Sequence, residues 1–234
     1  KEDQKIYEPN DYGLTSTIGE NIGEPVILDY MDYLGLPKAW YYTTGNRDIP
    51  IGISDGKIDT TLLDFKGKTT IFQDSPLANG HGISQAGNAA AQGDNGVGIP
   101  GVCYDCSIYG TRYGDSPDLK RLRELSNAGA RVINCSWGIR ISNKVGQEAI
   151  DEMLTNGTVI VASAGNTDWD KTRGELKLYP ASYDNVISVS STMFRYPTPE
   201  DHTLILENGI PYVENIEGYI GRTAGFKDND IEKG

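Results

Sequence analysis

The chain has 234 residues, of which 38% are hydrophobic and 23% charged, and its formal net charge is −12 at pH 7. This length and apolar content suffice for one domain with a full core. We expect no nucleic-acid partner, because phosphate binding needs clustered Lys and Arg, and no membrane partner, because no apolar run approaches membrane-spanning length. The chain begins at Lys1 without a signal-peptide pattern, so we expect a processed form or an excised fragment.

The first predicted elements lead to an acidic residue. Residues 1–33 are a polar, Gly-rich arm without a sustained apolar period, and a short helix is predicted at Leu34–Trp40. Asp48–Asp59 then contains a short apolar strand that ends in Asp55, with Gly56 turning the chain directly after it. Because the carboxyl ends of parallel strands form the ligand crevice of an α/β sheet, Asp55 is well placed for chemistry.

A histidine set between glycines follows a second predicted strand at Lys68–Phe72. The stretch Asn79–Ala91 places His81 at the start of a helix that is rich in small residues, which can lie close against a sheet. A lone histidine is usually a packed or solvated residue. At a loop-to-helix junction it can reach a cleft, where it needs a carboxylate and a nucleophile in order to act. Asp55 is the candidate carboxylate.

Together, Asp55 and the His81–Gly87 segment resemble the subtilisin-like serine proteases. That family carries its acid after the first core strand and its base in an H-G-T-x-x-A-G segment, so the resemblance implies catalytic roles for Asp55 and His81. Two positions depart from the family pattern. Gly56 directly follows the acid, where the family has Ser or Thr and then Gly, and Ile83 stands where Thr is usual.

Helices and apolar strands alternate through the rest of the chain. Near-continuous apolar strands separated by helices mean a parallel sheet that is covered on both faces. We therefore expect an α/β fold, a three-layer sandwich with a mainly parallel central sheet, similar to the subtilisin-like proteases. The predicted strands are Cys106–Tyr113, Val132–Gly138, Thr158–Asn166 and Tyr179–Val189, and the predicted helices open at Ser116–Pro117 and cover Val145–Leu154.

The end of one predicted strand supplies candidates for substrate binding. In the family, the equivalent N-x-S-x-G stretch lines the substrate channel and pairs with the substrate backbone. The resemblance therefore makes Ser136, Trp137 and Gly138 peptide-binding candidates. On the structural alternative, these residues only terminate a core strand.

The next predicted strand ends in Ala164, Gly165 and Asn166, which match the A-G-N of the family. The resemblance implies that the side-chain amide of Asn166 binds the oxyanion and that Ala164 and Gly165 lie beside the substrate. A preorganised donor at such a point stabilises the negative charge that develops in the transition state. The alternative is that Asn166 is only a turn former.

Asp64, Asp94 and Asn95 are candidates for a structural calcium site. Asp64 matches an acid that helps to bind calcium in some members of the family, and Asp94 and Asn95 could add oxygen ligands of the kind that calcium prefers. Each residue has an alternative as a turn residue. No cofactor is expected for the chemistry itself.

Cys103 and Cys106 are separated by two residues, and their state is left open between a disulfide in an exported protein and two reduced thiols. A structural zinc site needs four ligands, and the chain has only two histidines, His81 and His202. The resemblance implies an extracytoplasmic or secreted protein.

The nucleophile of the family lies in a G-T-S-[MF]-A-x-P segment, and no such segment occurs in the chain. We therefore predict an incomplete catalytic core over residues 34–191, followed by an acidic, polar insertion or frayed end over 192–234. The implied function is a serine endopeptidase that cleaves peptides or proteins through an Asp-His-Ser triad. Its serine would lie beyond Gly234, so this chain alone is predicted to be inactive. The alternative is a non-catalytic relative that binds peptides or proteins.

Two other classes of protein fit the sequence less well. Gly52–Gly56 fits the G-x-S-x-G nucleophile elbow of the α/β-hydrolases, with Ser54 as nucleophile, but such a short match arises easily by chance. A doubly wound nucleotide-binding module would need a Gly-rich phosphate loop, and neither G-x-G-x-x-G after the Asp55 strand nor a P-loop pattern is present.

Overall fold

The computed structural model describes residues 5–12, 31, 34–165 and 177–190, together with the backbone of four short strands in residues 194–222. The helices are α3 (Leu36–Trp40), α4 (His81–Ala90), α5 (Lys120–Asn127) and α6 (Lys144–Thr155). The strands of the main sheet are β1 (Ile51–Asp55), β2 (Thr69–Gln73), β3 (Ile108–Arg112), β4 (Val132–Cys135), β5 (Val159–Ser163) and β6 (Val186–Val189).

The main sheet has the strand order β2-β3-β1-β4-β5-β6, and every neighbouring pair is parallel. β1 therefore lies inside the sheet, between β3 and β4. From β1 the chain passes to the edge strand β2 and returns through β3, and it then crosses to the other side of β1 and moves outward through β4, β5 and β6. In open α/β sheets, ligands bind beyond the carboxyl ends of the strands at such a reversal of strand order. The end of β1 is that point here.

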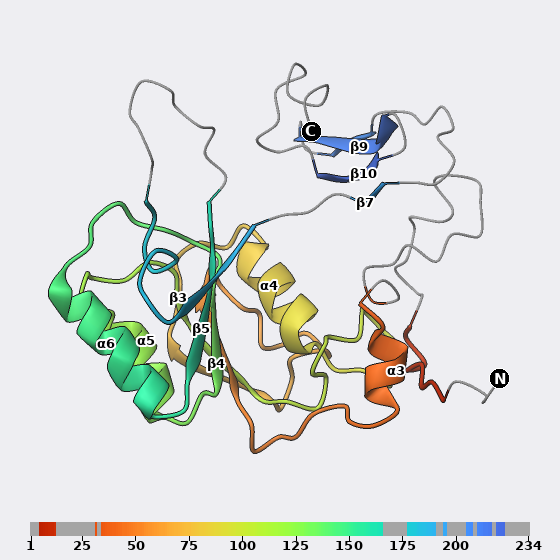
Figure 1. Ribbon diagram of the computed structural model, residues 1–234. Helices are drawn as coiled ribbons and strands as arrows, with labels where there is room; N and C mark the ends of the chain where they lie inside the picture. The colour runs from red at the N-terminus through yellow and green to blue at the C-terminus, as the bar shows by residue number, and fades with distance from the viewer. Residues whose placement is uncertain are drawn as a thin grey trace.

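Helices cover both faces of this sheet (Figure 1). α5 and α6 lie on one face, where Leu122, Leu125 and Met153 pack with β4 and β5 in a buried apolar cluster. α4 lies on the other face, where Ala86 and Ala90 pack against Ile53 and Ile108 of the central strands. The prediction of a three-layer α/β sandwich with a mainly parallel sheet is confirmed.

The predicted elements differ from the observed ones mainly at their ends. The helix that was predicted to open at Ser116–Pro117 begins instead at Lys120, after Leu119 in a left-handed conformation with a φ of 51°. Leu119 is 1% exposed, so its burial in the α5–α6 cluster stabilises a backbone conformation that the capping pattern did not indicate. Tyr179 precedes β6 and forms an isolated antiparallel bridge with Ile139.

Two further regions complete the described structure. A separate antiparallel sheet has the order β7 (Phe194–Arg195), β10 (Tyr219–Arg222), β9 (Ile210–Ile216), β8 (Ile205–Glu207), in a region where the sequence pattern indicated no element. Cys103 and Cys106 form a disulfide, which decides the question that the sequence left open. Within the described residues, no helix is both long and apolar enough to span a membrane.

Candidate active site

Asp55 is the last residue of the central strand β1, and its side chain is almost completely buried. Its Oδ1 atom accepts a hydrogen bond of 2.6 Å from the backbone N–H of Gly56. Its Oδ2 atom is also buried and has no hydrogen-bond partner among the described residues. A buried carboxylate oxygen without a hydrogen-bond partner is energetically costly. A carboxylate with only one of its two oxygens hydrogen-bonded therefore indicates that Asp55 has a role beyond packing.

His81 is the first residue of α4 and faces this carboxylate. Its Nδ1 atom lies 2.6 Å from Oδ1 of Asp55, while 47% of its side chain remains exposed. The backbone N–H of His81 is held by Oδ1 of Asn79 at 3.2 Å, which fixes the start of the helix. Because Nδ1 is engaged by the acid, Nε2 is the ring nitrogen that is left for another reacting group.

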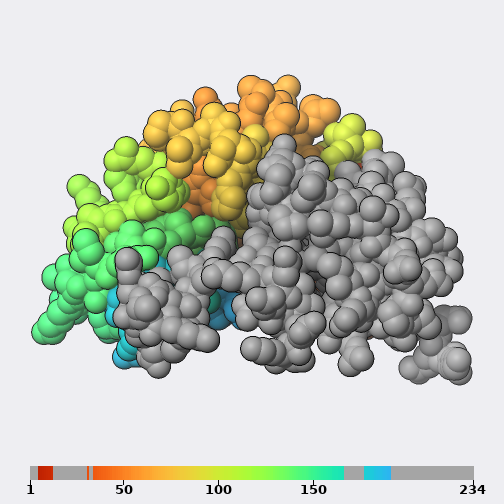
Figure 2. Space-filling view, turned by 90° about the horizontal axis from the view of Figure 1, so that it is seen from above, coloured from red at the N-terminus to blue at the C-terminus, as the bar shows by residue number. Residues whose placement is uncertain are grey.

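The close approach of α4 to the end of β1 depends on a glycine. A Cβ atom at Gly82 would lie only 2.2 Å from the carbonyl oxygen of Gly56 and 3.0 Å from that of Lys57. No side chain fits there, so Gly82 allows the helix to start directly against the turn that follows Asp55. Seen from above, the segment from the end of β1 to α4, coloured orange to gold, forms part of the surface of this face (Figure 2).

Ser136 lies beside this pair, and Trp137 does not expose its side chain. The hydroxyl of Ser136 donates to Oε1 of Gln85 at 2.9 Å. The indole of Trp137 is 7% exposed, and its Nε1 donates to Oγ of Ser54 at 3.0 Å. Gly138 is exposed, three residues after the end of β4. If this segment binds a substrate, Trp137 can contribute its backbone but not an open indole surface.

The predicted oxyanion segment is described only in part. The backbone N–H of Ala164 donates to the carbonyl oxygen of Val189 at 2.8 Å, so Ala164 continues the β5–β6 pairing. Gly165 is exposed and has a φ of 114°, a left-handed conformation that favours glycine. Asn166, the predicted oxyanion donor, lies outside the described residues.

Ser54 is not arranged as the nucleophile of an α/β-hydrolase elbow. The residue is completely buried, its hydroxyl donates to the carbonyl oxygen of Arg112 at 3.4 Å, and it accepts the indole N–H of Trp137. A nucleophile elbow exposes its serine at a sharp turn, whereas Ser54 lies inside β1 with its hydroxyl hydrogen-bonded. The elbow interpretation is therefore wrong.

Of the three calcium candidates, Asp64 and Asn95 contact each other, whereas the carboxylate of Asp94 is bound elsewhere. Nδ2 of Asn95 donates to Oδ1 of Asp64 at 2.7 Å, so these two side chains are neighbours. Asp94 instead accepts hydrogen bonds from the Tyr7 hydroxyl and from the backbone N–H of Asn10, at 3.0 Å for the latter. Within the described part of the chain, no group of three or more His, Cys, Asp or Glu residues could hold a metal ion.

Gln85 is a residue that the sequence pattern did not single out. It lies on α4 four residues after His81, and residues at this spacing share one face of a helix. Its contact to Ser136 extends through Ser136 to Nδ2 of Asn134 at 3.0 Å, which links α4 to the end of β4 beside the Asp55–His81 pair. The helical spacing was the available signal, but only the fold reveals its partner Ser136, which directly follows β4.

A parallel α/β sheet with a buried carboxylate hydrogen-bonded to a half-exposed histidine at its carboxyl edge defines a protein of the α/β class. The model of the Subtilase family (Peptidase_S8) matches residues 46–199, more than half of the chain. The chain therefore belongs to the Subtilase family.

Several characterised proteases are similar to this chain. A thermophilic serine proteinase of Bacillus sp. (strain AK1) is 32% identical over 176 residues, which cover 69% of this chain and 41% of that protein. Thermitase of Thermoactinomyces vulgaris is 32% identical over 170 residues, which cover 67% of this chain and 59% of thermitase. The chain thus spans about half of the length of these relatives.

Solved structures agree on the fold. The prenylagaramide maturation protease PagA superposes with a TM-score of 0.54 at 25% identity, over 66% of this chain and 57% of PagA. Fervidolysin of Fervidobacterium pennivorans superposes with a TM-score of 0.53 at 24% identity, over 92% of this chain and 33% of fervidolysin.

Proposed function

We propose that this chain supplies the acid and base of a serine endopeptidase. The observation that carries the proposal is the 2.6 Å contact between Oδ1 of Asp55 and Nδ1 of His81, at the central strand of a subtilase fold. Such a contact holds the imidazole in one tautomer and orientation and stabilises the imidazolium that forms during the reaction. It leaves Nε2 of His81 to exchange a proton with a nucleophile.

In the proposed mechanism, a serine from sequence that follows Gly234 attacks the carbonyl carbon of the peptide bond. His81 takes the proton from its hydroxyl and later gives it to the leaving amine, while Asp55 remains ionised. The side-chain amide of Asn166 donates to the oxyanion. This chain alone then hydrolyses peptides negligibly, because it holds the acid and base without the nucleophile.

The substrate is a peptide or protein that binds in an extended conformation. Backbone groups of Ser136–Gly138 would pair with one side of it, and those of Ala164 and Gly165 with the other side. Main-chain pairing of this kind binds an extended peptide largely independently of its sequence. The exposure of Gly138 and Gly165 supports this role.

A structural calcium ion is a separate part of the proposal. Asn95 now turns its amide nitrogen toward Asp64, and its amide oxygen accepts the backbone N–H of Val97, so it would have to turn that oxygen toward the ion in order to bind it with Asp64. Calcium takes six to eight oxygen ligands, so roughly four more would be backbone carbonyls and waters. Asp94 does not belong to this set, because Tyr7 and Asn10 engage its carboxylate. A chelator would then lower the midpoint of thermal unfolding, and Asp64→Asn would abolish that response.

We also propose that the intact protein acts outside the cytoplasm. Relatives include an extracellular serine protease of Serratia marcescens, which is 40% identical over 137 residues and of which this chain covers 13%. The Cys103–Cys106 disulfide supports this location, since disulfides persist in oxidising compartments.

Labelling with a fluorophosphonate tests the proposed function. The full-length gene product is labelled, and peptide mapping locates the adduct and the C-terminus. We expect one adduct, on a serine that follows residue 234, and its loss in a His81→Ala variant. No adduct on a folded protein would contradict the proposal and would favour a non-catalytic relative that binds peptides or proteins.

A further inference from the structure

A pocket of about 420 Å³ lies at the opposite end of α4 from His81. α4 has 10 residues and is therefore about 15 Å long, so the pocket is a separate site from the Asp55–His81 pair. A volume of this size is in the range of small-ligand sites. Its described lining residues are Tyr7, Trp40, Tyr41, Thr44, Gln92, Gly93, Asp94, Tyr104 and Asp105.

Four aromatic side chains contribute to the walls, and the inner two are held rigidly. Trp40 and Tyr104 are each 3% exposed, and their ring centroids lie 5.7 Å apart with an interplanar angle of 60°. Tyr12 packs edge-on against Trp40 at 6.0 Å and fixes it from the arm. Tyr41 is 43% exposed and presents the most accessible ring of the pocket.

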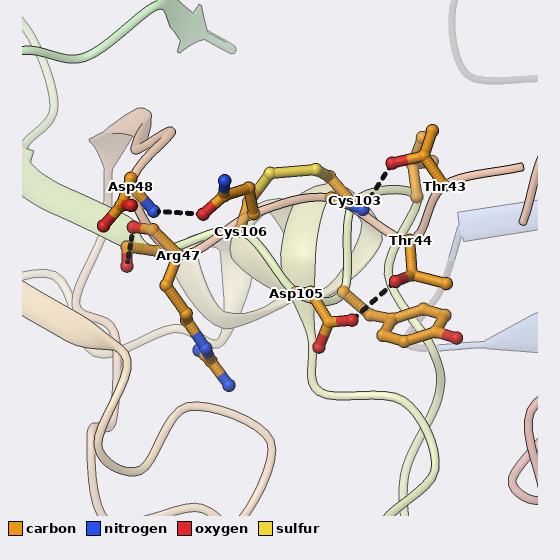
Figure 3. Close-up of a disulfide and its surroundings, with 12 residues drawn as sticks. Thr43, Thr44, Arg47, Asp48, Cys103, Asp105 and Cys106 are labelled. Atoms are coloured by element: carbon orange, nitrogen blue, oxygen red, sulfur yellow. Dashed lines mark hydrogen bonds between the residues drawn. A yellow bond between two sulfur atoms is a disulfide. The ribbon is translucent and has the colours of Figure 1, made fainter.

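The charged groups among these described lining residues are both carboxylates, and none is a cation. Asp94 is engaged by the Tyr7 hydroxyl. Oδ2 of Asp105 accepts a hydrogen bond of 2.5 Å from the Thr44 hydroxyl, and Figure 3 shows these two side chains beside the Cys103–Cys106 disulfide. Oδ1 of Asp105 makes no hydrogen bond to a described residue, so one carboxylate oxygen of the pocket remains available for a ligand.

The negative character of the pocket also affects its phenols. Burial, followed by the neighbouring Tyr7 and the two carboxylates, raises the pKa of Tyr104 far above its usual range. The hydrogen bond to Asp94, together with desolvation, raises the pKa of Tyr7. Both phenols therefore stay neutral at physiological pH, so their rings act as uncharged aromatic walls.

The chain itself places an ammonium group against one wall. Nζ of Lys5 lies 5.3 Å from the ring centroid of Tyr41, within the range of a cation–π interaction. Two other cations are hydrogen-bonded to lining residues of the pocket. Arg47 donates to the side-chain oxygen of Gln92 at 2.5 Å, and Lys68 donates to the backbone carbonyl of Tyr104.

We propose that this pocket binds an alkylammonium group, either the side chain of a lysine in a peptide or protein or a free amine. The exposed ring of Tyr41 stabilises the cation through its face, as it does the Lys5 ammonium, and Asp105 pairs with its charge. The site is distinct from the acid–base pair and adds a binding activity to the domain. If the ligand is a lysine side chain, the pocket selects proteins that carry an accessible lysine.

Isothermal titration calorimetry of the chain tests this site with n-butylammonium chloride and, as the neutral isostere, n-butanol. We expect saturable binding of the ammonium with a Kd on the order of 1 mM and none of the alcohol. Asp105→Asn keeps the shape but removes the charge, and should weaken binding roughly tenfold. Asp184→Asn, an exposed acid near β6, is the matched control and should bind as the wild type does.

A tripeptide with a central lysine and its norleucine analogue identify the source of the ammonium. Tighter binding of the lysine tripeptide than of n-butylammonium assigns the site to protein side chains, and equal binding assigns it to free amines. Circular dichroism checks each fold, and if Asp105→Asn does not fold, Tyr41→Leu decides by the same criterion. Equal binding of n-butanol, no saturation with any cation, or unchanged affinity in these pocket variants would overturn the proposal.

Discussion

The two ends of α4 are built in different ways. At its first residue, His81 contacts Asp55 because the backbones of Gly82 and Gly56 lie against each other, and the two residues are 26 positions apart in sequence. At its last turn, the aromatic pocket is assembled by side chains from the arm, from α3 and from the loops before β1 and β3, which are far apart in sequence.

This difference indicates how single substitutions should affect each end of α4. The His81 end depends on a few atoms, so a single added methyl group should displace the acid–base pair. The pocket end spreads its stability over many contacts, among them the disulfide and the hydrogen bond from the buried Lys68 to the carbonyl of Tyr104. Single changes there should cost some stability and leave the Asp55–His81 geometry intact.

Replacing His81 should have the largest effect on activity and little effect on stability. In the full-length protein, His81→Ala should lower kcat/KM for a peptide substrate at least about 10⁴-fold, in keeping with the losses that follow removal of triad residues in a subtilisin. The melting temperature should change little, since 47% of the side chain is exposed. Ser84→Ala, an exposed position on the same helix, is the control and should retain activity. An active His81→Ala variant would remove His81 from the mechanism.

Two glycines of α4 form a matched pair. Gly82→Ala places Cβ 2.2 Å from the carbonyl oxygen of Gly56, and we expect a loss of about 3 kcal/mol in the free energy of unfolding. At Gly87 the nearest atoms would lie 3.8 Å and 3.9 Å away, so Gly87→Ala should stabilise the helix by about 0.5–1 kcal/mol. Urea denaturation measures both values, and equal effects would refute the tight approach at Gly82.

Loss of the disulfide should affect only the pocket end. Cys103 and Cys106 enclose a very short loop, with a sequence separation of 3, so replacing both by Ser should lower the free energy of unfolding by at most about 2 kcal/mol. The NMR signals of the His81 ring should not move. Dithiothreitol should reproduce this loss in the wild type and leave the double variant unchanged. A shift of the His81 signals would show that the two ends are coupled.

Per pH unit, the smallest expected effect is a pH dependence at Lys68. Burial lowers its pKa from 10.5 to about 7 in the folded state. Between these values the unfolded chain binds more protons than the folded one, so stability rises with pH, and below about pH 7 the cost of burying the ammonium is fully present.

Lys68→Met removes this titration and is the comparison for it. Between pH 7 and pH 10, the free energy of unfolding should rise with pH more steeply for the wild type than for the variant. The difference in slope should be at most about 1.4 kcal/mol per pH unit. Denaturation series at several pH values give both curves. Parallel curves would mean that the pKa of Lys68 is not lowered in the folded protein.

The sequence by itself determined the layers of the fold and the positions of Asp55 and His81. Apolar strands that alternate with helices require a covered parallel sheet, and an acid after a buried strand lies at its carboxyl edge. The glycines around His81 marked a helix start with a close backbone approach. These features depend on local patterns, which the order of residues states directly.

Only the tertiary structure decided which side chains from distant segments contact one another. It paired Gln85 with Ser136, buried the Trp137 indole against Ser54, engaged Asp94 with the arm and assembled the aromatic pocket. Each of these contacts joins segments that are distant in sequence, and each depends on the rotamer that packing allows. Local sequence patterns do not predict such long-range contacts between side chains, because the free energy that selects these contacts comes from the packing of the whole fold.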